Sequence, residues 1–261
     1  MLITGATGFV GQKLMQMGTD VIACPSLRGA SEDDIRRLVE ECGADTIIHT
    51  AAMADTGACQ ADPEASYLAN VQLPVMLAKA AKGRKLICFS SDQVYSGAEE
   101  NGPYTEDHAK PGNVYAVHKL EMEQRVLEIL PEAVMLRAEW MYDYYLKKPN
   151  YFMNILKAED GIAFSSSQYR GITYVKEVAQ QMDRVMALPG GIYNFGSETN
   201  QSMYEITKEF LALIGKEIRL EDAPPRHNLW MNCEKARKLG VDFMRVEEGL
   251  KACAKDHGLL K

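Results

Sequence analysis

The stretch LITGATGFVG, residues 2–11, decides the fold: a short apolar strand runs into a turn with three glycines spaced three apart, and a helical pattern follows. In such a unit one glycine permits the tight turn and one lets backbone N–H groups approach a pyrophosphate. The third lets the helix pack close to the strand. The stretch therefore predicts a dinucleotide site at the start of the chain. The residues expected to bind the dinucleotide here are Gly5, Thr7, Gly8, Phe9, Val10 and Gly11.

Apolar strands and amphipathic helices alternate from this turn to about residue 140. Continuous apolar strands separated by helices indicate a parallel sheet that is covered on both faces. The predicted fold class is therefore α/β, a Rossmann-like doubly wound sheet. Pro74 is expected to kink or interrupt one of the helices. Strands are expected at 20–24, 45–52, 85–91 and 133–140, and helices at 31–43, 63–82 and 114–130.

The rhythm loosens after Trp140. Residues 143–152 are expected to form a loop, 175–188 and 202–215 helices, and 191–196 a strand. We therefore expect residues 1–140 to form the dinucleotide-binding core, with segments near 175–196 returning to it. Residues 141–261 are expected to form mainly a small substrate lobe over the strand ends, where ligands bind in this architecture.

Composition excludes several classes of function. The chain has 261 residues and a net charge of −7, which disfavours a nucleic-acid surface. No apolar run approaches the ~20 residues of a membrane helix, and the N-terminus does not resemble a signal peptide. Six scattered cysteines without a C-x-x-C pattern indicate free thiols in a reducing cytosol, with no metal site. We expect a cytoplasmic protein that binds neither nucleic acid nor membrane.

The end of the second strand bears on the choice of cofactor. Many dinucleotide sites carry an acidic residue there, which binds the ribose 2′-hydroxyl. This chain has Cys24, Pro25 and Ser26 instead, and Arg28 follows closely. A missing carboxylate removes repulsion against a 2′-phosphate, and Arg28 would attract one. The sequence thus slightly favours NADP(H) over NAD(H), unless Arg28 is an ordinary surface charge.

Tyr115 and Lys119 lie four residues apart on the predicted helix 114–130, so they share a face. A lysine beside a tyrosine favours the phenolate and lowers a pKa that starts near 10. The phenol then exchanges a proton with a substrate oxygen close to neutral pH. The spacing alone is common and also fits a plain amphipathic face.

Further segments resemble the extended short-chain dehydrogenase/reductases: HTAA (49–52), FSSDQVY (89–95), YTEDHAKPGNVYAVHK (104–119) and NFGS (194–197). The resemblance implies that Tyr115 is the catalytic acid/base and that Lys119 tunes it while holding the nicotinamide ribose. It implies that Ser91 binds the substrate carbonyl and that Asn70 has a structural or relay role. Ala51 and Ala52 would contact the cofactor.

Within that superfamily the chain is most similar to the dTDP-4-dehydrorhamnose reductase branch. The similar segments are SSDQVYSG (90–97), LRAEWMY (136–142), SQYRGITYV (167–175) and RHNLWMNCEK (226–235). The chain departs from that branch at Gly57 to Gln60, where charged substrate-side residues are missing. Ile172 replaces a proline. Lys13 stands where a glutamate supports a magnesium-bridged dimer in some members, so that metal site is not expected.

The turn after residue 90 discriminates between reactions. The sugar-nucleotide 4,6-dehydratases have an acidic pair at this turn, whereas here Gln93 follows Asp92, and a glutamine cannot act as the base of an elimination. The turn therefore favours hydride transfer to a ketone over dehydration. Asp92 is either a substrate contact or a turn residue, and Trp140 either stacks on a sugar or base or packs in the core. The residues expected to bind substrate are Ser91, Asp92, Gln93, Trp140 and Arg226.

The leading hypothesis is an NAD(P)H-dependent reductase of a keto group on a nucleotide-linked deoxysugar. One alternative is a non-catalytic NADP-binding regulatory subunit of another enzyme, a role that the resemblance also includes. Another alternative is a nucleotide-sugar epimerase, which would hold its cofactor tightly. Members of the superfamily often pair, so a homodimer is one option.

Overall fold

The computed structural model describes residues 1–144 and 149–260. Within them, a six-stranded sheet forms the centre of the molecule, and its strand order is β2-β1-β3-β4-β5-β9 with all neighbours parallel. The order reverses between β1 and β3, so the loops after these two strands diverge and leave a crevice at their carboxyl ends. The strands are β1 (Leu2–Thr4), β2 (Ile22–Ala23), β3 (Thr46–His49), β4 (Lys85–Ser91), β5 (Val134–Ala138) and β9 (Gly191–Phe195).

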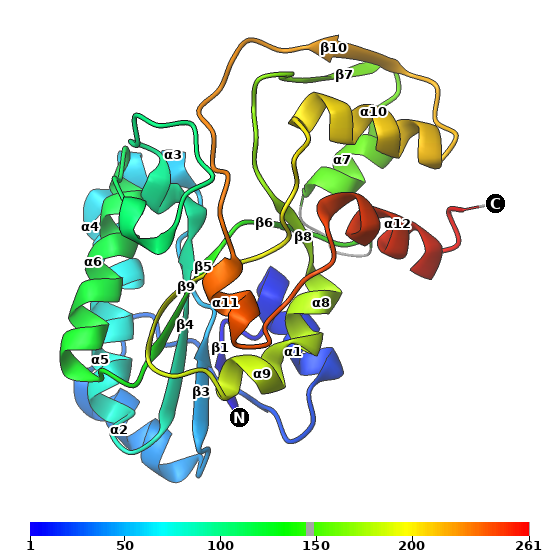
Figure 1. The fold of residues 1–261 in the computed structure, drawn as a ribbon. Coiled ribbons are helices and arrows are strands. Elements are labelled where there is room, and N and C mark those ends of the chain that lie inside the picture. The colour runs from blue at the N-terminus through cyan, green and yellow to red at the C-terminus, as the bar shows by residue number, and fades with distance from the viewer. Residues whose placement is uncertain (145–148, 261) are drawn as a thin grey trace.

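Helices cover both faces of this sheet (Figure 1). One apolar cluster packs α2, α5 and α6 against the sheet, and a second packs α1, α8, α9 and α11 against the other face. The doubly wound α/β fold predicted from the sequence is confirmed. The helices are α1 (Phe9–Met17), α2 (Glu32–Glu41), α3 (Thr56–Ala61), α4 (Pro63–Tyr67), the π-helix η1 (Leu68–Gln72), α5 (Leu73–Ala80), α6 (Val114–Ile129), α8 (Val175–Gln180), α9 (Met182–Met186) and α11 (Glu234–Lys238).

The helix expected at 63–82 is divided into α4, η1 and α5. Pro74 lies in the first turn of α5, where its missing N–H is tolerated. The π-turn just before it places Asn70 and Val71 inward. The helical stretch therefore continues through Pro74, with a π-turn just before the proline rather than a break.

A buried polar network joins the middle of the sheet to α6. The Arg137 guanidinium on β5 donates to both carboxylate oxygens of Glu123, and the Ser90 hydroxyl donates to the same carboxylate over 2.5 Å. Arg137 also donates to the Tyr95 hydroxyl, which donates to Asn194 on β9. These bonds fix the end of β4, from which the next residue, Ser91, projects.

The second lobe lies over the carboxyl end of the sheet (Figure 1). Its apolar core unites rings from α7 and α10 with Leu250 and Cys253 of α12. The lobe contains β6 (Trp140–Tyr142), β7 (Gly161–Phe164), β8 (Ile172–Tyr174), β10 (Arg219–Asp222), α7 (Tyr151–Lys157), α10 (Met203–Leu213) and α12 (Val246–Asp256). The two short 3-10 helices η2 (Asp92–Tyr95) and η3 (Glu106–His108) lie outside it.

Further expected elements differ from the structure. The strand expected at 133–140 ends at Ala138, and Trp140 begins β6, which pairs with β8 in a separate small sheet. The helix expected at 175–188 is split into α8 and α9. The loop expected at 143–152 is too long, because α7 begins at Tyr151; its residues 145–148 lie outside the described residues. Along the described ranges, every helix is too short or too polar to cross a bilayer.

Candidate active site

The glycine turn joins β1 to α1 as a close-packed unit. Gly5 has a φ of +68°, which favours glycine, and the Gly8 N–H donates to the Gly5 carbonyl over 2.8 Å. A Cβ at Gly11 would lie 2.2 Å from the Gly5 oxygen, and a Cβ at Gly5 would lie 2.7 Å from the Ala51 nitrogen. The structure therefore brings the turn against the loop after β3, at the point where the strand order reverses.

The N-terminus of α1 offers backbone donors to an anion. Gly8 is the N-cap residue, and among the described residues no side chain caps it. The N–H groups of the first helical turn are left for a ligand, and the helix dipole favours a negative charge there. Phe9 and Val10 begin the helix, and Thr7 is exposed beside it. The backbone donors of this turn are of the kind that binds the diphosphate of a dinucleotide.

Arg28 lies on the loop after β2, where its side chain is exposed. Cys24 continues the sheet by donating its N–H to the Ile3 carbonyl, so the loop leaves from the same edge as the glycine turn. Arg28 therefore lies on a loop at the same edge of the sheet as the glycine turn. The structure does not bring it into contact with the glycine turn.

The three residues expected to be catalytic converge at the end of β4. Ser91 ends the strand, and Tyr115 and Lys119 lie on the facing side of α6; all three side chains are buried. Asn113 caps α6 by accepting the Ala116 N–H over 2.9 Å, which fixes the first turn that carries Tyr115. The Lys119 ammonium lies 6.0 Å from the centre of the Tyr115 ring and donates to the Phe89 carbonyl over 2.5 Å.

Burial dominates the electrostatics of this group. It raises the pKa of the Tyr115 phenol, whereas the nearby Ser91 hydroxyl opposes the rise. Burial also lowers the pKa of Lys119 to about 8. The sequence predicts that Lys119 lowers the pKa of Tyr115, but the structure shows the opposite net shift because desolvation of the phenolate is the largest effect. The phenol is thus held in its protonated form.

The turn after Ser91 is buried and internally bonded. The Gln93 N–H donates to the Ser91 hydroxyl oxygen, and the Gln93 side chain accepts from Asn113. Asp92 is 2% exposed and forms an ion pair with Arg170. Asp92 is therefore a buried structural partner rather than a solvent-facing group. Gln93 is placed beside the start of α6, close to Tyr115.

Trp140 and Arg226 have different positions. The Trp140 ring stacks on the Arg170 guanidinium, with 3.7 Å between the guanidinium carbon and the ring centre, and the side chain is 48% exposed. The structure thus brings Trp140 to the site. Arg226 is exposed on the segment that runs from β10 to α11, and the next residue, His227, contacts the Tyr95 carbonyl. That segment passes the site, but Arg226 itself is not brought to Ser91.

Asn70 and Cys59 lie at the side of the site formed by η1 and α3. The Asn70 side chain accepts the Met53 N–H and donates to the Met53 carbonyl, each over 3.0 Å. These bonds fix the loop after β3, which carries Ala51 and Ala52. Cys59 on α3 lies close enough to raise the pKa of Tyr115. The unusual residues Gly57 to Gln60 therefore border the catalytic group, and Asn70 has the structural role that the sequence allows.

Sequence reasoning missed two buried charged residues beside Asp92. They are Arg170, just before β8, and Glu139, whose carboxylate accepts from the Thr173 hydroxyl and the Ser197 N–H. Burial and the nearby Asp92 carboxylate raise the pKa of Glu139 to about 8. The only sequence signal was their position: Glu139 precedes Trp140 at a strand end, and Arg170 lies in a segment already noted for its similarity.

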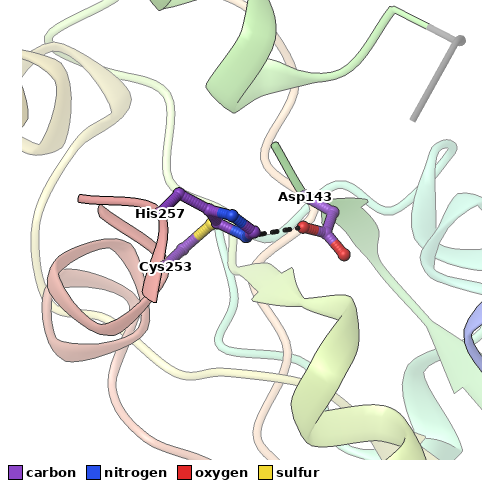
Figure 2. A group of neighbouring side chains, drawn as sticks. All are labelled: Asp143, Cys253 and His257. Carbon is purple, nitrogen blue, oxygen red and sulfur yellow. Dashed lines mark ion pairs between the residues drawn. The ribbon is translucent and has the colours of Figure 1, made fainter. Parts of the chain in front are cut away.

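A second polar cluster lies away from the site and contains Asp143, Cys253 and His257 (Figure 2). Their potential ligand atoms lie within 4.8 Å of one another. However, the Lys13 ammonium already pairs with Asp143 over 2.6 Å, and burial raises the pKa of the Cys253 thiol. Because a lysine ammonium occupies the carboxylate and the thiol is protonated, this group is an ion-pair cluster that links α1 to α12. Lys13 therefore has a structural role in this protein.

The site combines a glycine turn, a buried tyrosine–lysine pair and a serine at a strand end. Together these features define a Rossmann-fold protein of the extended short-chain dehydrogenase/reductase type. The family model of the RmlD substrate binding domain matches residues 1–241. The chain belongs to this family, the dTDP-4-dehydrorhamnose reductase-like branch of the superfamily, as its sequence motifs predict.

The proteins that are similar to this chain do not all have the same described function. The chain is 31% identical over 278 residues to methionine adenosyltransferase 2 subunit beta of Xenopus tropicalis, covering 92% of this chain and 82% of that protein. It is 34% identical over 151 residues to a dTDP-4-dehydrorhamnose reductase of Mycolicibacterium smegmatis, covering 54% and 46%. The structure of the Bacillus anthracis dTDP-4-dehydrorhamnose reductase in complex with NADP has the same fold, with a TM-score of 0.85, 21% identity and coverage of 98% and 97%.

Proposed function

We propose that this protein is an NAD(P)H-dependent reductase of a keto group on a nucleotide-linked deoxysugar. The observation that carries the proposal is the meeting of Ser91, Tyr115 and Lys119 at the carboxyl edge of the sheet. A protonated, buried phenol beside a hydroxyl suits the protonation of a carbonyl oxygen. Membership of the RmlD family supports the sugar substrate, and dTDP-4-dehydrorhamnose reductases are among its relatives.

Each residue has a distinct task in this reaction. NAD(P)H, when bound, supplies the hydride. Ser91 orients the carbonyl oxygen of the substrate by a hydrogen bond, and Tyr115 gives that oxygen its proton. Lys119 places a positive charge near the phenol and so stabilises the phenolate that remains. The Trp140 ring offers an exposed apolar face to the sugar or base.

NADP(H) is the proposed cofactor. The loop from Cys24 to Arg28 carries no carboxylate, and the exposed Arg28 guanidinium suits a 2′-phosphate. The solved Bacillus anthracis relative in complex with NADP supports the same choice. Paired binding titrations with NADPH and NADH test it: we expect Arg28→Met to weaken NADPH binding about tenfold and to leave NADH binding unchanged.

The substrate is found by assaying NADPH oxidation with a panel of dTDP- and UDP-linked 4-keto-6-deoxysugars and identifying the reduced product by mass. The proposal predicts stoichiometric reduction of one of these sugars. NADPH binding without oxidation of any member of the panel contradicts it.

A regulatory subunit is a second candidate, and two observations favour it. One relative that aligns over most of both chains is methionine adenosyltransferase 2 subunit beta of Xenopus tropicalis. In addition, the segment Gly57 to Gln60 lacks the charged residues expected on the substrate side of a reductase. Co-purification of the tagged chain with a larger enzyme, whose activity changes on binding, supports this candidate if no keto sugar is reduced.

A further inference from the structure

Arg170 forms the start of a chain of contacts that reaches Tyr115. Its guanidinium donates to Asp92 Oδ2 over 2.5 Å. The other oxygen of the same carboxylate, Oδ1, accepts the Ser91 hydroxyl over 3.2 Å. The Ser91 hydroxyl in turn influences the Tyr115 phenol. One arginine is thus linked to the catalytic group through a single carboxylate.

The surroundings hold this arginine rigidly. The Arg170 and Asp92 side chains are 2% and 3% exposed, so the ion pair is shielded from water. The guanidinium plane rests on the Trp140 ring, and Arg170 is held by bridge pairing with Leu229 on the segment that leads to α11. Within the described part of the chain, its buried Nε has no hydrogen-bond partner. The Arg170 guanidinium is therefore oriented for its contact with Asp92, although this orientation leaves its Nε without a hydrogen bond to any described residue.

Stability alone does not explain this pair. Replacing a buried ion pair by apolar residues is often neutral or stabilising, because desolvation costs as much as the attraction returns. Here a second carboxyl group, Glu139, also faces the guanidinium, but burial raises its pKa to about 8, so it does little to balance the charge of Arg170 at neutral pH. A local role for Asp92 at Ser91 accounts for the arrangement better.

We propose that Arg170 is a positioning residue, which holds Asp92 so that Asp92 fixes the Ser91 hydroxyl at the Tyr115 phenol. The assignment rests on the proposed reductase function for its kinetic consequence. The Asp92 carboxylate accepts the Ser91 hydroxyl through Oδ1 and the Arg170 guanidinium through Oδ2, so Arg170 sets the orientation in which the carboxylate meets Ser91.

The kinetic test compares Arg170→Met, Arg170→Lys and the double variant Asp92→Asn/Arg170→Met with the wild type. We expect Arg170→Met to lower kcat about 10- to 100-fold while KM for NADPH stays unchanged, because only the geometry at Ser91 is disturbed. Arg170→Lys should recover part of the rate, since its ammonium still pairs with Asp92. Arg237→Met is the control for the loss of an arginine ion pair, because it removes the more exposed pair with Glu198, and its kcat should match the wild type.

The double variant separates positioning from stability. It contains no unpaired buried charge, so its urea unfolding midpoint should return toward that of the wild type, whereas its kcat should stay low. A double variant with kcat within about twofold of the wild type overturns the proposal, as does a kcat that follows the unfolding midpoint through the series.

The failure of the proposed function has a different signature. If the wild type reduces no keto sugar, the reductase assignment fails, and crystal structures of the wild type and the double variant then test positioning directly. The proposal predicts that the Ser91 side chain changes rotamer or moves away from Tyr115 in the variant. An unchanged Ser91 in that structure overturns the positioning role as well.

Discussion

The Lys119 ammonium lies in a buried environment and faces a backbone carbonyl, not a carboxylate. Burial therefore lowers its pKa from 10.5 to about 8. The folded protein binds fewer protons than the unfolded chain between these two values, so this residue makes stability rise with pH across that window. Lys119 is thus expected to lose its positive charge near pH 8 in the folded protein.

Glu139 has the opposite effect on stability. Its folded pKa is about 8 and its ordinary value is 4.5, so the folded state holds the extra proton between them. Stability should therefore fall as pH rises from about 4.5 to about 8. Glu139→Gln keeps an acceptor for Thr173 and Ser197 but cannot ionise. Urea unfolding at several pH values should show the variant gaining stability over the wild type as pH rises.

The exposed Glu128 on α6 provides the control, because Glu128→Gln should leave the pH dependence unchanged. A stability difference between Glu139→Gln and wild type that stays constant from pH 5 to about 8 would show that Glu139 is ionised throughout.

At the scale of elements, local signals predict most of the sheet and the helices around it. The capping box of Ser31 and Asp34 begins α2 at Glu32, one residue after the predicted start. The second strand is shorter than expected and contains Ile22 and Ala23 only. It starts late because Asp20, just before it, adopts a positive φ of 52°, which is not extended backbone. These differences arise at ends, where neighbouring turns override the apolar pattern.

The close packing of α1 on β1 yields a direct prediction. Gly11→Ala places a Cβ 2.2 Å from the Gly5 oxygen, so the turn must shift. We expect the variant to lose about 1–3 kcal/mol of unfolding free energy and to bind NADPH at least about tenfold more weakly. Gly57→Ala is the control, because its Cβ meets only an Asp55 side-chain oxygen at 3.2 Å within α3. Calorimetry and fluorescence titration measure both quantities, and an unaltered NADPH affinity in Gly11→Ala would remove the turn from the cofactor site.

At the scale of the whole molecule, the second lobe could not be read from the sequence in the same detail. Strands β7 and β10 pair although they are far apart in the chain, and each has only four residues, so neither has a local signature. The residues of the candidate site likewise differ in how far they can be predicted from the sequence. Ser91, Tyr115 and Lys119 belong to contiguous motifs, whereas Arg170 reaches Asp92 only through the tertiary fold.

The lobe is fastened to the sheet domain by the ion pair of Lys13 with Asp143, beside His257 at the end of α12. Asp143→Asn removes the charge that these two groups face. We expect about 1–3 kcal/mol lower stability and faster amide exchange in α12, with the exchange of β3 and β4 unchanged. Asp183→Asn, on the exposed side of α9, is the control. Exchange in α12 that matches the wild type would show that the apolar core of the lobe alone holds this helix.

The central claim is that Tyr115 donates the proton in a reduction. The most direct measurement is the rate of NADPH oxidation with a dTDP-4-keto-6-deoxysugar, compared between the wild type and Tyr115→Phe at saturating cofactor. We predict oxidation by the wild type and a loss of about 10²- to 10⁴-fold in the variant, with NADPH affinity retained because the ring remains. Equal rates in the two proteins, or no oxidation by a wild type that binds both ligands, would contradict it.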